Sequence, residues 1–487
     1  MADKTPEELN HSRLLDVHRW SDWPEVNAFV DMIYETHFAK RTNIRKKHVK
    51  VLLLDLYVAW HEDPDLCIAV HMRSERYKPK SRYNELHISR TMVEVVRELH
   101  TAGLIHLHRG FFDRSSGIGR TTRIWPASQL LRAFQDASIG VLDIGYQEGR
   151  ETIILRDSDG NDIEYEDTKQ TLRMRETLTA YNELLQATHI DCQHLDQPWV
   201  KKKQGRAPVS QHHKFVRRIF SRSSWEQNGR FYGGFWQSLP KADRGRIAIN
   251  GKRTLELDFS GFHVALLYRM RGINYYSTIG GDPYDIEIPE VSDPEFRRQL
   301  IKRTMLICLN AEDEKSACRA ICVDPSILAS KPSGLELTNI LLMGVINKLK
   351  AKHDAIAPQF CSDAGIELMH LDSKITEELI AQYTADGIPL LSVHDSYIIQ
   401  EVYGDDLHER MQNAMRAVAP VPDDVDELFE LPNHTRIIQH GYFDEELGVD
   451  DKKHAEMLHI KGQEYVSEAY LKRLGDFRRW MDSKTYQ

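Results

Sequence analysis

The sequence Leu-Ser-Val-His-Asp-Ser-Tyr-Ile-Ile at residues 391–399 is an apolar run interrupted by a short polar turn. Its aliphatic, β-branched and aromatic residues favour a strand on each side of the turn, with Asp395 at the tip. A similar stretch, Leu-Glu-Leu-Asp-Phe-Ser-Gly at residues 255–261, places Asp258 at the end of another apolar strand, 137 positions earlier. Together the two stretches predict buried strands that each end in a carboxylate.

Two such carboxylates meet the requirement of a two-metal phosphoryl-transfer site. Mg²⁺ is a hard cation that binds carboxylate and phosphate oxygens, and a pair of ions stabilises both the attacking and the leaving oxygen of an in-line displacement. A single aspartate in a turn more often only caps a strand. The interpretation of Asp258 and Asp395 therefore depends on the residues that accompany them.

A candidate phosphate-binding helix lies between the two strands. Arg298, Lys302, Leu306 and Asn310 recur every four residues, which predicts one face of a helix, with Arg303 nearby. Two cations followed by a short polar group can bind a triphosphate and the sugar or base attached to it. Phosphoryl transfer depends on positioning and on neutralising phosphate charge, so this helix complements the carboxylates. A row of cations is also common on a solvated helix face.

Length and composition are compatible with a large intracellular enzyme. The chain is 41% hydrophobic and 28% charged, which is ordinary for a folded protein. Its length of 487 residues predicts two to four domains. No apolar stretch reaches the roughly 18 residues of a membrane span, and the polar start does not resemble a secretory signal. Six cysteines without a CxxC pair are typical of free thiols. We therefore expect a cytoplasmic protein with no zinc site and no membrane partner.

Charge is unevenly distributed along the chain, although the net charge is only −9. Residues 72–132 contain 12 Lys/Arg and 5 Asp/Glu, and residues 197–253 contain 14 and 2. Residues 401–451 contain 3 Lys/Arg and 14 Asp/Glu. Local basic surfaces bind nucleic acid by neutralising phosphates, so the first two segments are candidate DNA contacts.

The first basic segment coincides with a regular pattern of elements. Residues 46–62 carry an apolar helical stripe, residues 67–71 read as a strand, and residues 88–99 carry a second stripe that ends at Gly103. Strands at residues 104–109 and 121–125 then enclose a turn rich in Gly, Ser and Asp. This order of helices, strand and basic hairpin resembles a winged helix-turn-helix domain.

In a winged helix-turn-helix, the helix before the hairpin enters the major groove and the hairpin touches the DNA backbone. The resemblance therefore implies DNA contacts from the basic side chains of these two elements, which are Arg90, Arg97, Arg114, Arg120 and Arg123. A winged helix used for protein contacts is the alternative. Further along, Arg230 lies among aromatic residues and glycines at residues 228–236, a combination that suits a nucleic-acid path and also suits a protein core.

Three motifs in order give the most specific resemblance. They are Asp-Phe-Ser-Gly at residues 258–261, Arg298-x3-Lys302, and His-Asp-Ser at residues 394–396. They resemble motifs A, B and C of the family-A polymerase superfamily, which comprises bacterial family-A DNA polymerases and phage-type and mitochondrial single-subunit RNA polymerases. Residues 356–360, 370–373 and 387–389 look most like the phage-type RNA polymerases. The similarity covers roughly residues 225–440, without a proofreading exonuclease.

The resemblance implies the roles of several residues. Asp258 and Asp395 would hold two Mg²⁺ ions, with Mn²⁺ as an alternative, and Phe259 would offer its backbone carbonyl. Arg298 and Lys302, with Arg303 nearby, would bind the phosphates of the incoming nucleotide. Leu306, Asn310 and His263 would lie along the rest of the nucleotide.

Two departures from the family pattern leave the choice of sugar open. Asn310-Ala311 stands where the family usually has Tyr-Gly, and His263 stands where DNA polymerases have a ribose-excluding Glu and RNA polymerases a Gly. A bulky His263 argues for deoxynucleotides. Ser396, where DNA polymerases have Glu, argues for kinship with RNA polymerases.

We therefore expect an α+β protein with four parts: a winged helix-turn-helix domain (1–133), a connecting domain of helix, hairpin and basic loop (134–224), a right-hand-type palm and fingers with an antiparallel catalytic sheet (225–450), and a helical end (451–487). The expected function is template-directed nucleotidyl transfer, as a DNA-dependent RNA or DNA polymerase or a primase-polymerase for replication of a mobile element. Its partners would be a DNA template, an RNA or DNA primer, and NTP or dNTP. The alternative is a DNA-binding initiator or regulator with an inactive polymerase-like domain.

Overall fold

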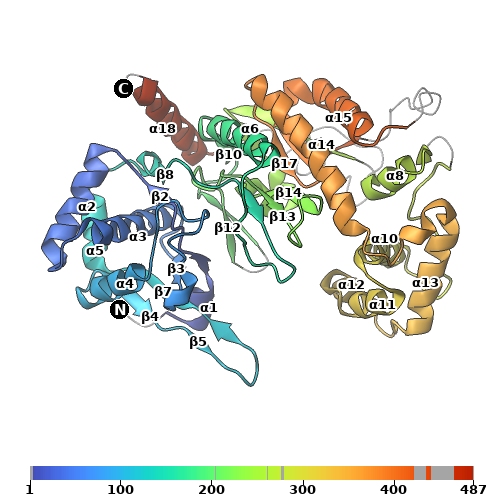
Figure 1. Cartoon of the computed structure of the whole chain (residues 1–487), viewed down its shortest axis with the longest axis horizontal. Helices are drawn as coiled ribbons and strands as arrows, with labels where there is room; N and C mark the ends of the chain where they lie inside the picture. Colours follow the sequence, from blue (N-terminus) through green and yellow to red (C-terminus); the bar gives the residue numbers. More distant parts are fainter. Residues whose placement is uncertain are drawn as a thin grey trace.

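The computed structural model describes residues 4–202, 205–259, 261–275, 279–421, 435–439 and 466–485. Over these residues the chain is a mixed α+β protein, as expected, with an N-terminal lobe, a central sheet and a group of helices beyond the sheet (Figure 1). Ser260, much of the acidic segment 401–451 and the first part of the helical end expected at 451–487 lie outside the described residues. None of the described helices is long and apolar enough to cross a membrane.

The N-terminal lobe comprises residues 4–144 and packs around one apolar core. Its four-stranded sheet has the order β1-β3-β7-β4. In chain order, the elements are α1 (Pro6–Asn10), β1 (Ser12–Leu14), β2 (Arg19–Trp20), α2 (Pro24–His37), α3 (Asn43–Glu62), β3 (Cys67–Val70), the 3-10 turn η1 (Ser74–Arg76), α4 (Thr91–Thr101), β4 (Ile105–His108), β5 (Phe111–Phe112), β6 (Gly119–Arg120), β7 (Thr122–Pro126), α5 (Ser128–Asp136) and η2 (Val141–Asp143).

Helix α4 and the hairpin after it form where the sequence predicts them. Gly103 takes a left-handed conformation (φ 72°) that lets Leu104 N–H donate to the Leu99 carbonyl at 3.0 Å, which ends the helix. Strands β4 and β7 pair, and β5 and β6 extend them into an arm that projects from the lobe (Figure 1). Between β3 and α4 the chain has only η1 and no α-helix, so the helix that packs against α4 is α3.

The middle of the chain, residues 145–249, links the lobe to the central sheet. It contains β8 (Gly145–Tyr146), β9 (Ile153–Leu155), α6 (Lys169–Gln186), β10 (Ile190–Cys192), β11 (Trp199–Lys201), β12 (Arg206–Pro208), β13 (Arg217–Phe220), β14 (Asn228–Tyr232), η3 (Phe235–Ser238), α7 (Lys241–Arg244) and β15 (Ile247–Ile249). Strand β10 pairs with β15 in the central sheet. The expected domain boundary between residues 224 and 225 therefore crosses one sheet.

The central sheet has the order β10-β15-β16-β18-β17, and its later strands are β16 (Lys252–Phe259), β17 (Leu391–Val393), β18 (Ser396–Gln400) and β19 (Thr435–Gln439), which pairs with β16. Alternate residues of β18 enter different cores: Tyr397 and Ile399 pack with α10–α15, whereas Ile398 packs with α6 and β13. The sheet is thus buried on both faces, which accounts for the uninterrupted apolar runs in its strands.

The helices beyond the sheet are α8 (Phe262–Arg269), α10 (Pro294–Asn310), α11 (Glu314–Val323), α12 (Pro325–Ser330), α13 (Asn339–Lys352), α14 (Gly365–Ala385) and α15 (Gly404–Val418), with the 3-10 turns η4 (Asp354–Gln359) and η5 (Glu401–Tyr403). Helices α10–α13 cluster together, and the long α14 runs from this cluster past β14 and α6 (Figure 1). Thr376 of α14 also contacts Tyr397 of β18, so α14 links the helical cluster with the central sheet.

The last described helix, α18 (Glu468–Thr485), lies beside β10 and α6 (Figure 1). Ser467 Oγ donates to Asp196 at 2.7 Å, and Arg473 Nε donates to the buried Asp191 of β10 at 2.7 Å. The C-terminal helix is therefore fixed to the edge of the central sheet.

Candidate carboxylate site

Strand pairing brings the two predicted carboxylates together. Strands β16 and β18 are antiparallel, and their register places Asp258 opposite Ser396, the residue after Asp395. Asp395 sits in the turn between β17 and β18, where His394 takes a left-handed backbone conformation (φ 59°). Both aspartates are partly exposed, while the strand residues around them are buried. The pair therefore lies at the partly exposed ends of two interior strands of the central sheet.

A buried ion pair supports these strands from within. Arg244 donates from Nε and Nη2 to both carboxylate oxygens of Glu256, at 3.0 and 2.9 Å. Ser396 Oγ donates to Glu256 Oε1 at 2.7 Å, across the β16–β18 pair. Ser396 therefore holds the two strands in register, and its hydroxyl is engaged inside the protein.

A second group of polar side chains adjoins Asp395. Arg230 Nε donates to Asp372 Oδ2 at 2.6 Å, and Arg230 Nη2 lies 3.3 Å from His263 Nε2. Asp372 comes from α14 and is 1% exposed, so three separate elements meet here. Arg230, which the sequence assigned to a DNA path, is placed at the carboxylate site.

Burial dominates the electrostatics of this group. It raises the pKa of Asp372 to about 6; the Arg230 guanidinium opposes this rise and the Asp395 charge adds to it. Burial, together with Arg230, lowers the pKa of His263 to about 4. Near neutral pH the group therefore has an ionised Asp372, a charged Arg230 and a neutral His263.

Helix α10 presents the predicted row on its exposed face. Arg298, Lys302, Leu306 and Asn310 are all exposed, and apolar residues between them, such as Leu300, Met305 and Leu309, enter the core. Arg298 pairs with Asp282, and the Lys302 ammonium lies 5.8 Å from the Tyr284 ring centre. Asn310 Nδ2 donates to the Leu306 carbonyl at 2.8 Å.

Arg303 differs from the other cations of α10. It is half-buried and pairs with Asp324, the residue that caps α12. The structure therefore places it in the packing of α10 against α12. Among the described contacts of α10, the one that leads toward the carboxylates is its packing against α14.

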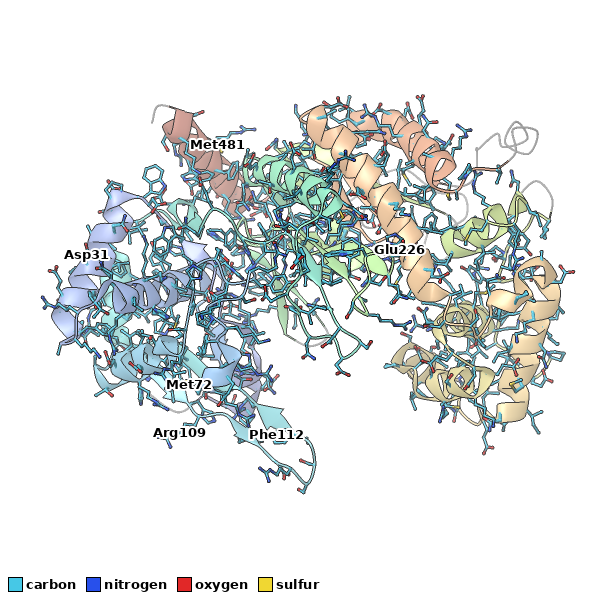
Figure 2. All side chains as sticks on the ribbon, in the orientation of Figure 1. Asp31, Met72, Arg109, Phe112, Glu226 and Met481 are labelled. Atoms are coloured by element: carbon cyan, nitrogen blue, oxygen red, sulfur yellow. The ribbon has the colours of Figure 1, made fainter. Side chains whose placement is uncertain are left out.

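The predicted DNA-binding residues of the lobe fall into two groups. Arg90, Arg97 and Arg114 are exposed, the first two at α4 and the third on the projecting arm, whose Phe112 is labelled in Figure 2. Arg120 Nη2 instead lies 2.9 Å from His108 Nε2, and Arg123 donates to the carbonyls of Leu9 and Thr121. The second group therefore supports the lobe itself.

The donor set can be compared with the requirements of Mg²⁺. Among the residues that the structure describes, no three or more His, Cys, Asp and Glu side chains are grouped to hold a metal ion. Mg²⁺ is usually held by one or two protein carboxylates, with water and substrate phosphates completing its shell, so the Asp258 and Asp395 pair fits it. Phe259 follows Asp258 in β16 and pairs with Thr435 of β19.

Sequence reasoning did not assign a role to Asp372, Arg244 or Glu256. One signal was present for Glu256: residues two apart in a strand point to the same face, so Glu256 shares a face with Asp258. The pairing of Arg230 with Asp372 joins residues 142 positions apart and has no local signal.

Comparison of the chain with models of known protein families gave no match. Comparison with curated proteins also gave none.

Proposed function

We propose that the chain is a template-directed nucleotidyltransferase, a DNA-dependent RNA or DNA polymerase or primase-polymerase, with its active site at Asp258 and Asp395. The observation that carries this proposal is the β16–β18 register, which brings two partly exposed carboxylates from distant motifs to the same end of two paired strands. Two functionally unrelated aspartates 137 positions apart would rarely lie at the same end of two paired strands. The α10 row and its position between the two motifs in the chain give independent support.

Each group has a defined task in this proposal. Asp258 and Asp395, with the Phe259 carbonyl, would hold two Mg²⁺ ions. The ions, when bound, supply charge stabilisation for the attacking 3′-oxygen and the leaving pyrophosphate. Arg298 and Lys302 neutralise the triphosphate, and for this Arg298 must exchange Asp282 for phosphate. Arg230 keeps Asp372 and His263 in place beside Asp395.

The N-terminal lobe is the proposed DNA-binding part, a winged helix-turn-helix variant. Helix α4 presents Arg90 and Arg97, and the arm presents Arg114 beside exposed Phe111 and Phe112. Cations on a helix and on an adjacent hairpin match the contacts that such domains make with the major groove and the backbone. The sequence and this arrangement favour duplex DNA as the partner.

The test offers labelled NTPs and dNTPs separately to the full-length protein, with and without primer, on single-stranded and duplex DNA. We expect Mg²⁺-dependent incorporation that Asp258→Asn and Asp395→Asn each lower at least about a hundredfold, because metal stabilisation of the transition state amounts to several kcal/mol. Asp405→Asn, on the exposed first turn of α15, is the matched control and should retain activity.

Duplex binding distinguishes the possible outcomes of this test. Both site variants should bind DNA as well as the unmodified protein, because the substitutions lie outside the N-terminal lobe. Undiminished synthesis in either variant would refute the assignment of the active site. Tight DNA binding without incorporation from any nucleotide set would instead favour an initiator with an inactive polymerase-like domain.

A further inference from the structure

Two of the six free cysteines lie side by side where α10 meets the chain that leads into α14. Cys361 N–H donates to the Cys308 carbonyl at 2.7 Å, and Asp363 N–H donates to the Ala311 carbonyl at 2.9 Å. A direct backbone hydrogen bond keeps the two Cα atoms within about 6 Å, a separation that disulfides span. The backbone is therefore already placed for a covalent bond between the two side chains.

The two thiols differ in reactivity. A hydrogen bond with Cys308 lowers the pKa of the Cys361 thiol, and the nearby Lys350 ammonium lowers it further, although partial burial opposes the change. The same hydrogen bond, with burial, raises the pKa of Cys308. Cys361 is partly exposed, whereas Cys308 is fully buried. Because the thiolate is the nucleophile, Cys361 is the thiol that reacts first.

We propose that Cys308 and Cys361 are a redox modification site: a hydroperoxide converts them into a disulfide, and this bond lowers nucleotide incorporation. The effect on incorporation rests on the function proposed above, whereas disulfide formation does not. In the first step the Cys361 thiolate attacks the peroxide, its sulfur becomes a sulfenic acid and an alcohol or water leaves. In the second step Cys308 attacks that sulfur, the S–S bond forms, and the lost proton and hydroxide leave as water.

The cysteine pair lies between the end of α10 and the start of α14, so a disulfide there would affect both helices. Cys308 precedes Asn310 of the exposed row by two residues, and a Cβ at Gly365, the first residue of α14, would lie only 2.2 Å from Asn310 Oδ1. The disulfide would hold the two sulfur atoms about 2.05 Å apart. It would thus lock the end of α10 to the chain that enters α14, the helix that carries Asp372. A lock that holds reacting groups about 1 Å from their working positions costs up to about a hundredfold in rate.

The modification is tested on the full-length protein with hydrogen peroxide as the oxidant. After alkylation of the remaining thiols and proteolysis, mass spectrometry should find one linked peptide pair, containing Cys308 and Cys361, that dithiothreitol separates. Cys361→Ser should abolish the linked pair, while Cys322→Ser, a similarly exposed cysteine of α11, should leave it unchanged. Alkylation of Cys308 and Cys361 to the same extent before and after peroxide, or linkage of either to another cysteine, would overturn the assignment.

The consequence is tested by incorporation before and after oxidation. We expect oxidation to lower the rate at least about tenfold, dithiothreitol to restore it, and Cys361→Ser to be unaffected by peroxide. If the oxidised protein carries the disulfide but incorporates nucleotides as fast as the dithiol form, regulation is refuted and the modification site stands. A reduced protein that incorporates nothing would refute the proposed function, and the linked peptides would still report on the cysteines.

Discussion

Asp372 is the residue whose environment departs furthest from that of an ordinary carboxylate near the proposed site. It is fully buried beside Arg230 and the charge of Asp395, and its pKa rises to about 6. A carboxyl group that binds its proton more tightly in the folded state stabilises the fold most at low pH. That contribution is lost as pH rises from about 4, the value in unfolded chains, to about 6.

Asp372→Asn should remove this pH dependence. We expect the melting temperature of the unmodified protein, relative to the Asn variant, to fall between pH 4 and pH 6 and to stay level above pH 7. Folded His263, with its pKa lowered to about 4, titrates with the opposite sign, but it is present in both proteins and largely cancels in the difference. Measurement is by thermal melting across pH 4–8. A constant difference over that range would show that Asp372 is not the group that titrates.

At the scale of elements, helix α10 is the clearest link between sequence and proposed function. Its row is exposed because the opposite face of the helix, with Leu300, Ile301, Met305, Cys308 and Leu309, is apolar and enters the core. Arg298→Ala and Lys302→Ala should therefore leave the melting temperature within about 2 °C and raise the KM for nucleotide at least about tenfold, because each removes a phosphate partner. Lys315→Ala, an exposed lysine of α11, is the control.

The partner of Arg298 provides a test with the opposite sign. Asp282 competes with phosphate for the guanidinium, so Asp282→Ala should lower the KM for nucleotide by releasing Arg298. The measurement is steady-state incorporation as a function of nucleotide concentration. A higher KM in this variant would show that Asp282 positions Arg298 for its ligand and does not compete with it.

The sequence could predict features that depend on neighbouring residues, but not those that depend on residues far apart in the chain. The α10 row, the end of α4 at Gly103 and the apolar strands follow from spacings of two to four residues, so their prediction needed only neighbouring positions. The Arg230–Asp372 pair and the bond from Ser396 to Glu256 join residues 142 and 140 positions apart. Their geometry depends on how the sheet and α14 pack together, and no local pattern encodes it.

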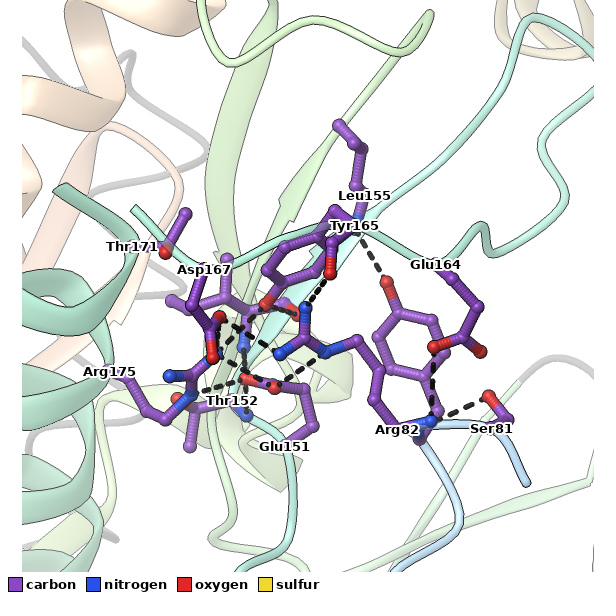
Figure 3. A network of polar contacts seen from close by, with 12 residues as sticks. Ser81, Arg82, Glu151, Thr152, Leu155, Glu164, Tyr165, Asp167, Thr171 and Arg175 are labelled. Carbon is purple, nitrogen blue, oxygen red and sulfur yellow. Dashed lines mark hydrogen bonds and ion pairs between the residues drawn. The ribbon is translucent and has the colours of Figure 1, made fainter. Parts of the chain in front are cut away.

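At the scale of the whole molecule, the interface between the N-terminal lobe and the rest of the chain determines how the lobe is placed relative to the carboxylate site. Arg82 of the lobe donates to the Tyr165 carbonyl at 2.6 Å and to Asp167 at 2.9 Å, and its Nε lies 3.2 Å from Glu151, which Arg175 also binds (Figure 3). A second contact joins Glu62 to Ser210 at 2.8 Å. These mostly buried contacts fix the proposed DNA-binding lobe relative to the carboxylate site, so the two would act at a set distance along DNA.

Loss of Arg82 should loosen this interface. Arg82→Ala leaves the buried Glu151 with one fewer cation and removes the hydrogen bonds to Tyr165 and Asp167, so we expect a lower melting temperature and a lobe that unfolds in a separate transition. Arg156→Ala, which breaks the exposed pair with Asp162, should cost at most about 1 kcal/mol.

Calorimetry checks both variants. If Arg82→Ala melts as the Arg156→Ala control does, the lobe is held mainly by its other contacts. If it instead shows two transitions and binds duplex DNA normally, but starts synthesis at scattered positions, the interface is what sets the distance between recognition and synthesis.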